Sequence, residues 1–234
     1  IILINKLLLK KFGTPYISQN APNPLDMIIA TILSQNTNDK NSYKAYTELK
    51  KKYPRWELAV NEPRMTIEKI IRTAGLAKQK STAMKNLLIT LSKRDKNISL
   101  DYLNKMSDEE VLNELTSFKG VGTKTAACVL MFSMKRNICP VDTHVHRTLN
   151  RIGLVSTSTP DKTFVQLHKK FPDKIAHSFH TNLIRLGREI CKPANPLCSV
   201  CPLEKICTFS QKNYAETSVI KKNDFMLLDN IAVN

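Results

Sequence analysis

Four cysteines towards the carboxyl-terminal end of the chain have a spacing that suits the binding of a metal. They form the pattern Cys191-x6-Cys198-x2-Cys201-x5-Cys207. Four thiolates can hold either a tetrahedral zinc ion or a four-iron cluster, because both accept all-sulfur ligation. Zinc sites usually present two close cysteine pairs, whereas only Cys198 and Cys201 are a close pair here. The spacing therefore favours an iron-sulfur cluster and leaves zinc as the alternative.

A glycine-rich turn in the middle of the chain has the features of a phosphate-binding site. Its sequence is Lys119-Gly120-Val121-Gly122-Thr123, and its two glycines allow a sharp turn and the close approach of a ligand. We expect the amides of Gly120, Gly122 and Thr123 to point outwards at the start of a helix, where partial positive charge favours a phosphate. An ordinary interhelical turn would also fit, so this motif alone is not decisive.

Lys124 and Asp142 are the residues best suited to a reaction. Lys124 follows the glycine turn on a segment that is otherwise nearly apolar, where a charge is costly unless it faces a cleft. Asp142 stands at the start of the next expected helix, and it can cap that helix and still take part in chemistry. A phosphate-binding role for Lys124 and a purely capping role for Asp142 are the alternatives.

The balance of charges indicates a polyanionic partner. The chain has 36 Lys and Arg against 20 Asp and Glu, a formal net charge of +16. Nucleic acid is the commoner explanation for so large an excess, with a general solubility feature as the alternative. No apolar run is long enough to span a bilayer, no secretion signal is evident, and thiols stay reduced inside cells. We therefore expect a soluble, cytoplasmic protein without disulfides.

The elements that must position these residues are all expected to be helices. Asn23 caps a helix that begins at Pro24, and Ser107 and Glu110 form a capping box before another. Residues 123–134 are nearly apolar all round, as in a helix buried among others. Further helices are expected at residues 39–53, 67–74, 79–92, 143–152, 160–171 and 175–189. Because no strand alternation is found, the predicted class is all-α.

Taken together, these motifs resemble the endonuclease III family of helix-hairpin-helix DNA glycosylases, which end in an iron-sulfur cluster loop. Residues 120–126 resemble the family's hairpin, Val-Asp-Thr-His at 141–144 its aspartate motif, and the cysteine pattern its cluster loop. The similarity covers roughly residues 23–207. It includes residues 32–39 and 75–80, which match loops that in the family enter the DNA base stack.

The resemblance implies an all-α fold of two lobes. Residues 17–136 would form a six-helix barrel with the helix-hairpin-helix at about 107–134. Residues 1–16 and 137–207 would form a lobe around a 4Fe-4S cluster, and 208–234 would be an extension, either ordered or frayed. The partner would be double-stranded DNA with damaged bases or abasic sites, bound by a monomer, and the protein would be cytoplasmic and nucleoid-associated. The cluster ligands would be Cys191, Cys198, Cys201 and Cys207.

The implied activity is base-excision repair of oxidised pyrimidines and abasic sites, with glycosylase and lyase steps. Lys124 would attack the sugar C1′ of a flipped-out nucleotide, release the base and leave a Schiff base, and β-elimination would then cut the strand. Asp142 would help to deprotonate Lys124 and would stabilise positive charge on the sugar. Lys124 must be neutral to attack, so a desolvated cleft is required.

Several further residues match DNA-contacting positions of the family. Asn36 and Leu76 match residues that fill the gap left by the flipped nucleotide, and Lys80 is expected to meet a phosphate. Lys119 stands where the family often has proline and is expected to add a phosphate contact. His144 of the aspartate motif is also expected to bind DNA, together with the hairpin residues Gly120, Val121, Gly122 and Thr123.

Neighbouring subfamilies differ at single positions. Mismatch uracil or thymine glycosylases and adenine glycosylases place another residue at the position of Lys124, and adenine glycosylases have a catalytic Glu where this chain has Ala30. Glycosylases for 8-oxoguanine generally lack the four-cysteine loop. The alternatives that remain are a mismatch uracil or thymine glycosylase, a non-catalytic helix-hairpin-helix DNA-binding module, and an electron carrier with little affinity for DNA.

Overall fold

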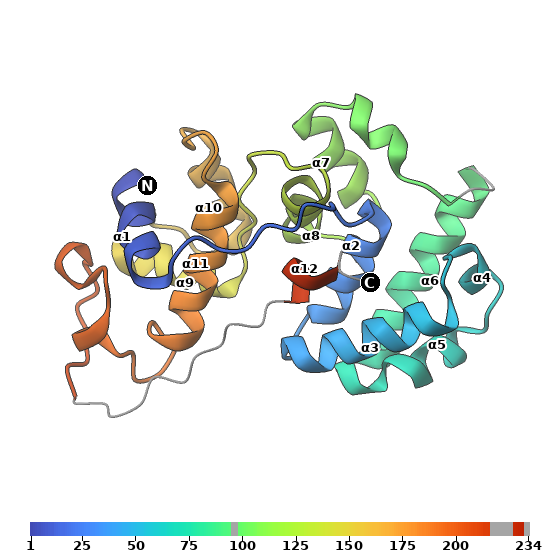
Figure 1. Cartoon of the computed structure of the whole chain (residues 1–234), viewed down its shortest axis with the longest axis horizontal. Helices are drawn as coiled ribbons and strands as arrows, with labels where there is room; N and C mark the ends of the chain where they lie inside the picture. Colours follow the sequence, from blue (N-terminus) through green and yellow to red (C-terminus); the bar gives the residue numbers. More distant parts are fainter. Residues whose placement is uncertain (95–97, 216–226, 232–234) are drawn as a thin grey trace. The chain divides into compact units, whose positions relative to one another are not determined.

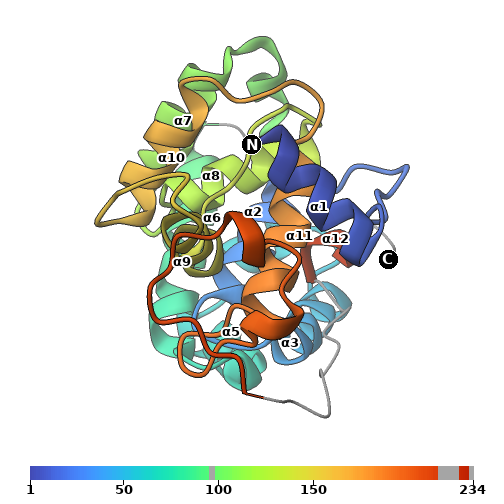
Figure 2. The ribbon, with the colours of Figure 1, turned by 90° about the vertical axis from the view of Figure 1, so that its left-hand side faces the viewer.

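The computed structural model describes residues 1–94, 98–215 and 227–231, and within these ranges the regular structure is helical, without strands. The predicted all-α class is therefore confirmed. The chain forms two compact units (Figures 1 and 2). We call Ser18–Arg136 with Phe225–Asn234 the hairpin unit, and Ile1–Ile17 with Asn137–Asp224 the cysteine unit.

The hairpin unit is built around α2 (Pro24–Ser34), which is buried along most of its length. The side chain of Asn23 accepts a hydrogen bond from the Leu25 amide at 2.9 Å, so the predicted cap is confirmed. Around α2 pack four further helices, which are α3 (Asp39–Lys52), α6 (Ala77–Arg94), α8 (Thr123–Cys128) and α12 (Leu227–Asn230). Figure 1 shows α12 beside α2.

Shorter helices complete the hairpin unit. They are α4 (Glu57–Val60), α5 (Arg64–Ile70) and α7 (Asp108–Thr116), with two 3-10 turns at Ile71–Ala74 and Asp101–Lys105. The predicted capping box is confirmed, since Ser107 Oγ accepts from the Glu110 amide and the Glu110 carboxylate accepts from the Ser107 amide. The helix expected over residues 123–134 is less regular than predicted. It is α8 followed by a π-helical turn, in which the Met134 amide donates to the carbonyl of Val129.

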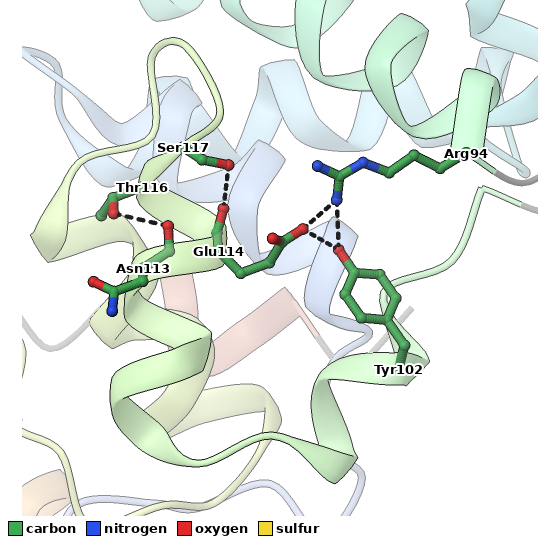
Figure 3. A network of polar contacts seen from close by, with 6 residues as sticks. All are labelled: Arg94, Tyr102, Asn113, Glu114, Thr116 and Ser117. Atoms are coloured by element: carbon green, nitrogen blue, oxygen red, sulfur yellow. Dashed lines mark hydrogen bonds and ion pairs between the residues drawn. The ribbon is translucent and has the colours of Figure 1, made fainter.

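A polar network holds the helix before the glycine turn (Figure 3). Arg94 at the end of α6 pairs with Glu114 of α7, and the hydroxyl of Tyr102 donates to the same carboxylate at 2.7 Å. The Arg94 guanidinium also lies 5.2 Å from the centre of the Phe118 ring. Because Phe118 immediately precedes the turn, these contacts tie one arm of the hairpin to α6.

The cysteine unit places α11 (Ala176–Glu189) between α1 (Ile2–Phe12) and α9 (Thr143–Ile152), with α10 (Pro160–His168) packed on α9. Asn182 and Arg185 of α11 attach the end of α1 by donating to the carbonyls of Gly13 and Phe12. Gly153 ends α9 in the left-handed conformation, at φ 83°, as expected for a glycine after a helix. Two 3-10 turns, Cys198–Val200 and Glu204–Ile206, shape the cysteine loop.

Candidate active site and nucleic-acid interface

Lys124 lies at the second position of α8, directly after the glycine turn. Its side chain is half-buried, whereas the three residues that follow it are buried. No residue in the described part of the chain accepts a hydrogen bond from the amides of Gly122, Thr123 or Lys124. Three N–H groups at the start of a helix are therefore available to a ligand, and the Lys124 side chain begins at the last of these three residues.

The glycine turn is held against α6. Gly120 is exposed and has φ 94°, and a Cβ atom added to it would lie 2.7 Å from the Cβ of Ala83. Lys119 is exposed. Val121 is expected to bind DNA as part of the hairpin, but its side chain is 5% exposed and its amide donates to the Phe118 carbonyl at 3.0 Å. Val121 therefore anchors the turn, and its side chain and N–H are not available to DNA.

Asn36 and Leu76 lie at the tips of two loops of the hairpin unit, after α2 and after the Ile71–Ala74 turn. Both are non-glycine residues with positive φ, at 50° and 48°, and both are exposed. Half of the Leu76 surface is open to solvent. An exposed leucine on a left-handed backbone residue at a loop tip suits a wedge that enters another molecule.

The expectation that Lys80 meets a phosphate is wrong in this structure. Its side chain is 1% exposed, and its ammonium donates to the carbonyls of Leu33 at 2.8 Å and Ala74 at 2.7 Å. Burial lowers the pKa of Lys80 from its ordinary value of 10.5 to about 8. The charge is directed into the hairpin unit, so Lys80 offers no ammonium to DNA.

Asp142 is the N-cap of α9 in the cysteine unit, and its carboxylate accepts from the Val145 amide at 2.8 Å. This hydrogen bond fixes the position of one carboxylate oxygen, Oδ1. His144 is half-buried in the first turn of the same helix. Burial lowers the pKa of His144, although the nearby Asp142 carboxylate opposes that shift. His144 therefore favours the neutral imidazole.

Two arginines that the sequence analysis did not single out hold the start of the cysteine loop. Arg147 donates to the Cys191 carbonyl from Nε at 3.1 Å and from Nη2 at 2.9 Å. Arg151, one turn later, donates to the Lys192 carbonyl at 2.7 Å and lies 3.6 Å from the Cys191 sulfur. The signal was the i, i+4 spacing of two arginines on α9, since such residues share one helix face. The helix capped by Asp142 thus also supports the cysteine loop.

None of the four loop cysteines forms a disulfide in the described part of the chain. The pKa of Cys201 is raised to about 11, first by burial and then by the nearby thiols of Cys191, Cys207 and Cys198. Within the described ranges, no three His, Cys, Asp or Glu side chains form a ready ligand set for a single metal ion.

In the same ranges, no helix has the length and apolar character that crossing a membrane requires.

Comparison with known proteins agrees with these features. The family model for HhH-GPD superfamily base excision DNA repair proteins matches residues 29–173. Endonuclease III of Thermotoga maritima is 36% identical over 192 residues, which are 81% of this chain and 85% of that protein. A candidate DNA glycosylase of Arabidopsis thaliana is 39% identical over 189 residues, which are 76% of this chain but only 64% of the plant protein, less than two thirds of its length.

A solved structure is also similar. The structure of a trapped endonuclease III–DNA covalent intermediate matches with a TM-score of 0.76 at 26% identity, over 88% of this chain and 93% of that chain. The helical fold, the glycine turn and the family match thus define the class, and the chain belongs to the HhH-GPD superfamily of base excision DNA repair proteins. Within this superfamily it belongs to the endonuclease III family, which confirms the resemblance seen in its motifs.

Proposed function

We propose that this protein is a bifunctional DNA glycosylase that removes oxidised pyrimidines from double-stranded DNA and cuts the strand at the resulting abasic sites. The observation that carries the proposal is the half-buried Lys124, which follows Gly122 and Thr123, whose N–H groups have no acceptor among the described residues. Such N–H groups bind a phosphate, and a lysine beside them can reach the sugar of the same nucleotide. The trapped covalent complex of a similar endonuclease III supports this chemistry.

Lys124 would act as the nucleophile in its neutral form. Its Nζ forms a bond to the sugar C1′, the bond from C1′ to the damaged base breaks, and the base takes up a proton as it leaves. The lysine nitrogen gives up one proton, the C1′–O4′ bond breaks as O4′ takes up a proton, and a protonated Schiff base joins Lys124 to the opened sugar. Loss of a proton from C2′ then breaks the C3′–O bond, which cuts the strand on the 3′ side.

Asp142 would take the proton from Lys124 and stabilise the positive charge that develops on the sugar. Only a carboxylate can do both, because an amide neither accepts a proton at neutral pH nor carries a negative charge. The hydrogen bond from the Val145 amide fixes the orientation of this carboxylate within its own unit. His144, which favours its neutral form, can accept or donate a hydrogen bond near the phosphate backbone.

The donor set of the cysteine loop fits a 4Fe-4S cluster. Each iron of such a cluster takes one thiolate, and the loop offers four thiols. Ligands of different irons stand further apart than ligands of one zinc ion, so the loop needs no tight tetrahedral set. The ligands would be Cys191, Cys198, Cys201 and Cys207. When bound, the cluster would brace the loop that carries Lys192 and Lys205, and it has no part in the bond-breaking steps.

Borohydride trapping tests the proposal. A Schiff base reduced by borohydride becomes a stable link, so wild-type protein is expected to form a covalent adduct with a duplex that contains an abasic site. Lys124→Gln should form no adduct and should still bind. The matched control is Lys119→Gln, which removes an exposed lysine from the same turn and should weaken binding in a salt-dependent way but keep the adduct.

The outcomes separate the alternatives. Release of uracil or thymine from mismatches without an adduct would indicate a monofunctional mismatch glycosylase. Tight binding without base release would indicate a non-catalytic DNA-binding module. Little affinity for DNA at either low or moderate salt would indicate the third alternative, an electron carrier. A panel of duplexes with thymine glycol, dihydrouracil, hydroxycytosine or an abasic site then ranks the lesions.

A further inference from the structure

Lys80 joins the ends of two structural elements that are far apart in the sequence. Its ammonium contacts the Leu33 carbonyl in the last turn of α2 and the Ala74 carbonyl at the end of the Ile71–Ala74 turn. The loop with Asn36 begins two residues after Leu33, and the loop with Leu76 begins directly after Ala74. One buried charge therefore connects the bases of both loops.

The chemistry of helix ends explains why a charge sits there. The last carbonyls of a helix have no N–H partner within the helix and carry partial negative charge, so a cation is favourable beside them. The Leu33 carbonyl also accepts from Ser42 Oγ at 3.3 Å. Without Lys80, the Ala74 carbonyl would lose its ammonium donor and the Leu33 carbonyl would keep only the longer contact.

The backbone of both loop tips needs such support. Asn36 and Leu76 have φ values of 50° and 48°, a conformation that costs free energy for residues other than glycine and persists only where the surroundings impose it. The Lys80 amide also donates to the Leu76 carbonyl at 3.0 Å. Lys80 therefore holds the Leu76 tip through its backbone, and the bases of both loops through its side chain.

We propose that Lys80 is a positioning residue that fixes the spacing between Asn36 and Leu76, so that both side chains enter a lesion-containing duplex together. This inference rests on the proposed function, because it assumes that the two side chains fill the space left by a flipped nucleotide. Lys80 itself touches neither the DNA nor the reacting atoms. Its effect is expected in lesion recognition and not in the nucleophilic step.

The test measures binding to a duplex with a tetrahydrofuran abasic analogue and a neighbouring 2-aminopurine, whose fluorescence rises when it is unstacked. Wild type should prefer this duplex to an undamaged one and should raise the fluorescence. Lys80→Met should lower the preference by about tenfold and reduce the fluorescence change, because two carbonyls lose a charged donor. Lys80→Arg, which keeps the charge and the donors, should restore at least part of both.

The matched control is Lys85→Met on the same helix. The Lys85 ammonium also donates to carbonyls at a helix end, those of Ala59 and Val60 of α4. Neither of these carbonyls lies at the base of the loop with Asn36 or of the loop with Leu76. Lys85→Met should therefore lower the stability of the protein but keep its preference for the lesion duplex. An equal loss of preference in Lys85→Met, or an unchanged preference in Lys80→Met, would overturn the proposal.

A double-mutant cycle tests the coupling directly and does not require Lys80→Met to fold. In wild type, the effects of Asn36→Ala and Leu76→Ala on affinity should be non-additive, because the two loops act together. Additive effects in wild type would overturn the inference. Each proposal can fail without the other. If the two substitutions are non-additive but wild type forms no borohydride adduct, only the proposed lyase activity is refuted. If wild type forms the adduct but the effects of the two substitutions on affinity are additive, only the role of Lys80 is refuted.

Discussion

Gly120 lies so close to Ala83 that a Cβ atom on the glycine would be 2.7 Å from the alanine Cβ. The same glycine has φ 94°, a conformation that side chains disfavour. The glycine turn thus packs so closely against α6 that only a residue without a side chain fits at position 120.

Gly120→Ala is expected to lower the free energy of unfolding by about 2 kcal/mol or more, since the backbone conformation and the overlap both oppose the methyl group. Gly122→Ala is the control. Gly122 is the N-cap of α8 with φ −99°, and nothing lies within 4 Å of an added Cβ, so Gly122→Ala should cost only the weaker capping preference of alanine, at most about 1 kcal/mol. Urea denaturation measures both, and equal losses would contradict the packing argument.

The cap that Asp142 forms and the proton transfer proposed for it can be tested separately. Asp142→Asn keeps an oxygen that can accept from the Val145 amide, so its stability should stay close to wild type, whereas Asp142→Ala should lose about 1 kcal/mol with the cap. Both variants should slow base release by about 100-fold or more, because the carboxylate is lost. Thermal denaturation and single-turnover base release are the measurements. Normal base release by Asp142→Asn would restrict Asp142 to capping.

The buried ammonium of Lys80 predicts a rise of stability with pH. Its pKa is lowered to about 8 in the folded protein, against an ordinary 10.5 in the unfolded chain. Between these values the unfolded state binds more protons, so the free energy of unfolding that depends on Lys80 increases as pH rises. The difference in unfolding free energy between wild type and Lys80→Met should change in the wild type's favour from about pH 8 to pH 10.5. A constant or falling difference would contradict the burial of a charged Lys80.

Iron content distinguishes the loop cysteines from the buried one in α8. Cys201→Ala should lose iron and the brown colour, because a ligand of the proposed cluster is removed. Cys128 is fully buried in α8, and Cys128→Ala should keep the iron of wild type. Elemental analysis and the visible spectrum check this. A colourless wild-type protein with stoichiometric zinc would refute the cluster.

Local signals predicted much of the fold. The cap at Asn23, the capping box of Ser107 and Glu110 and the glycine that ends α9 act within a few residues, and all are present in the structure. The short helix α4 and the π-helical turn after Cys128 escaped prediction. Four residues are too few for a periodic pattern, and a π-helical turn has no distinct residue preference from which to infer it.

The sequence by itself determined the family, because the glycine turn, the Asp142 motif and the cysteine spacing are local patterns that chemistry restricts to few residue types. Lys80 marks the limit of such patterns. The resemblance to the family suggested a phosphate contact for Lys80, but one of its carbonyl partners lies 47 residues away in the chain. Only tertiary packing buries the side chain and brings two helix ends to one ammonium. The direction of a long flexible side chain depends on which acceptors surround it, and that is decided when the helices pack.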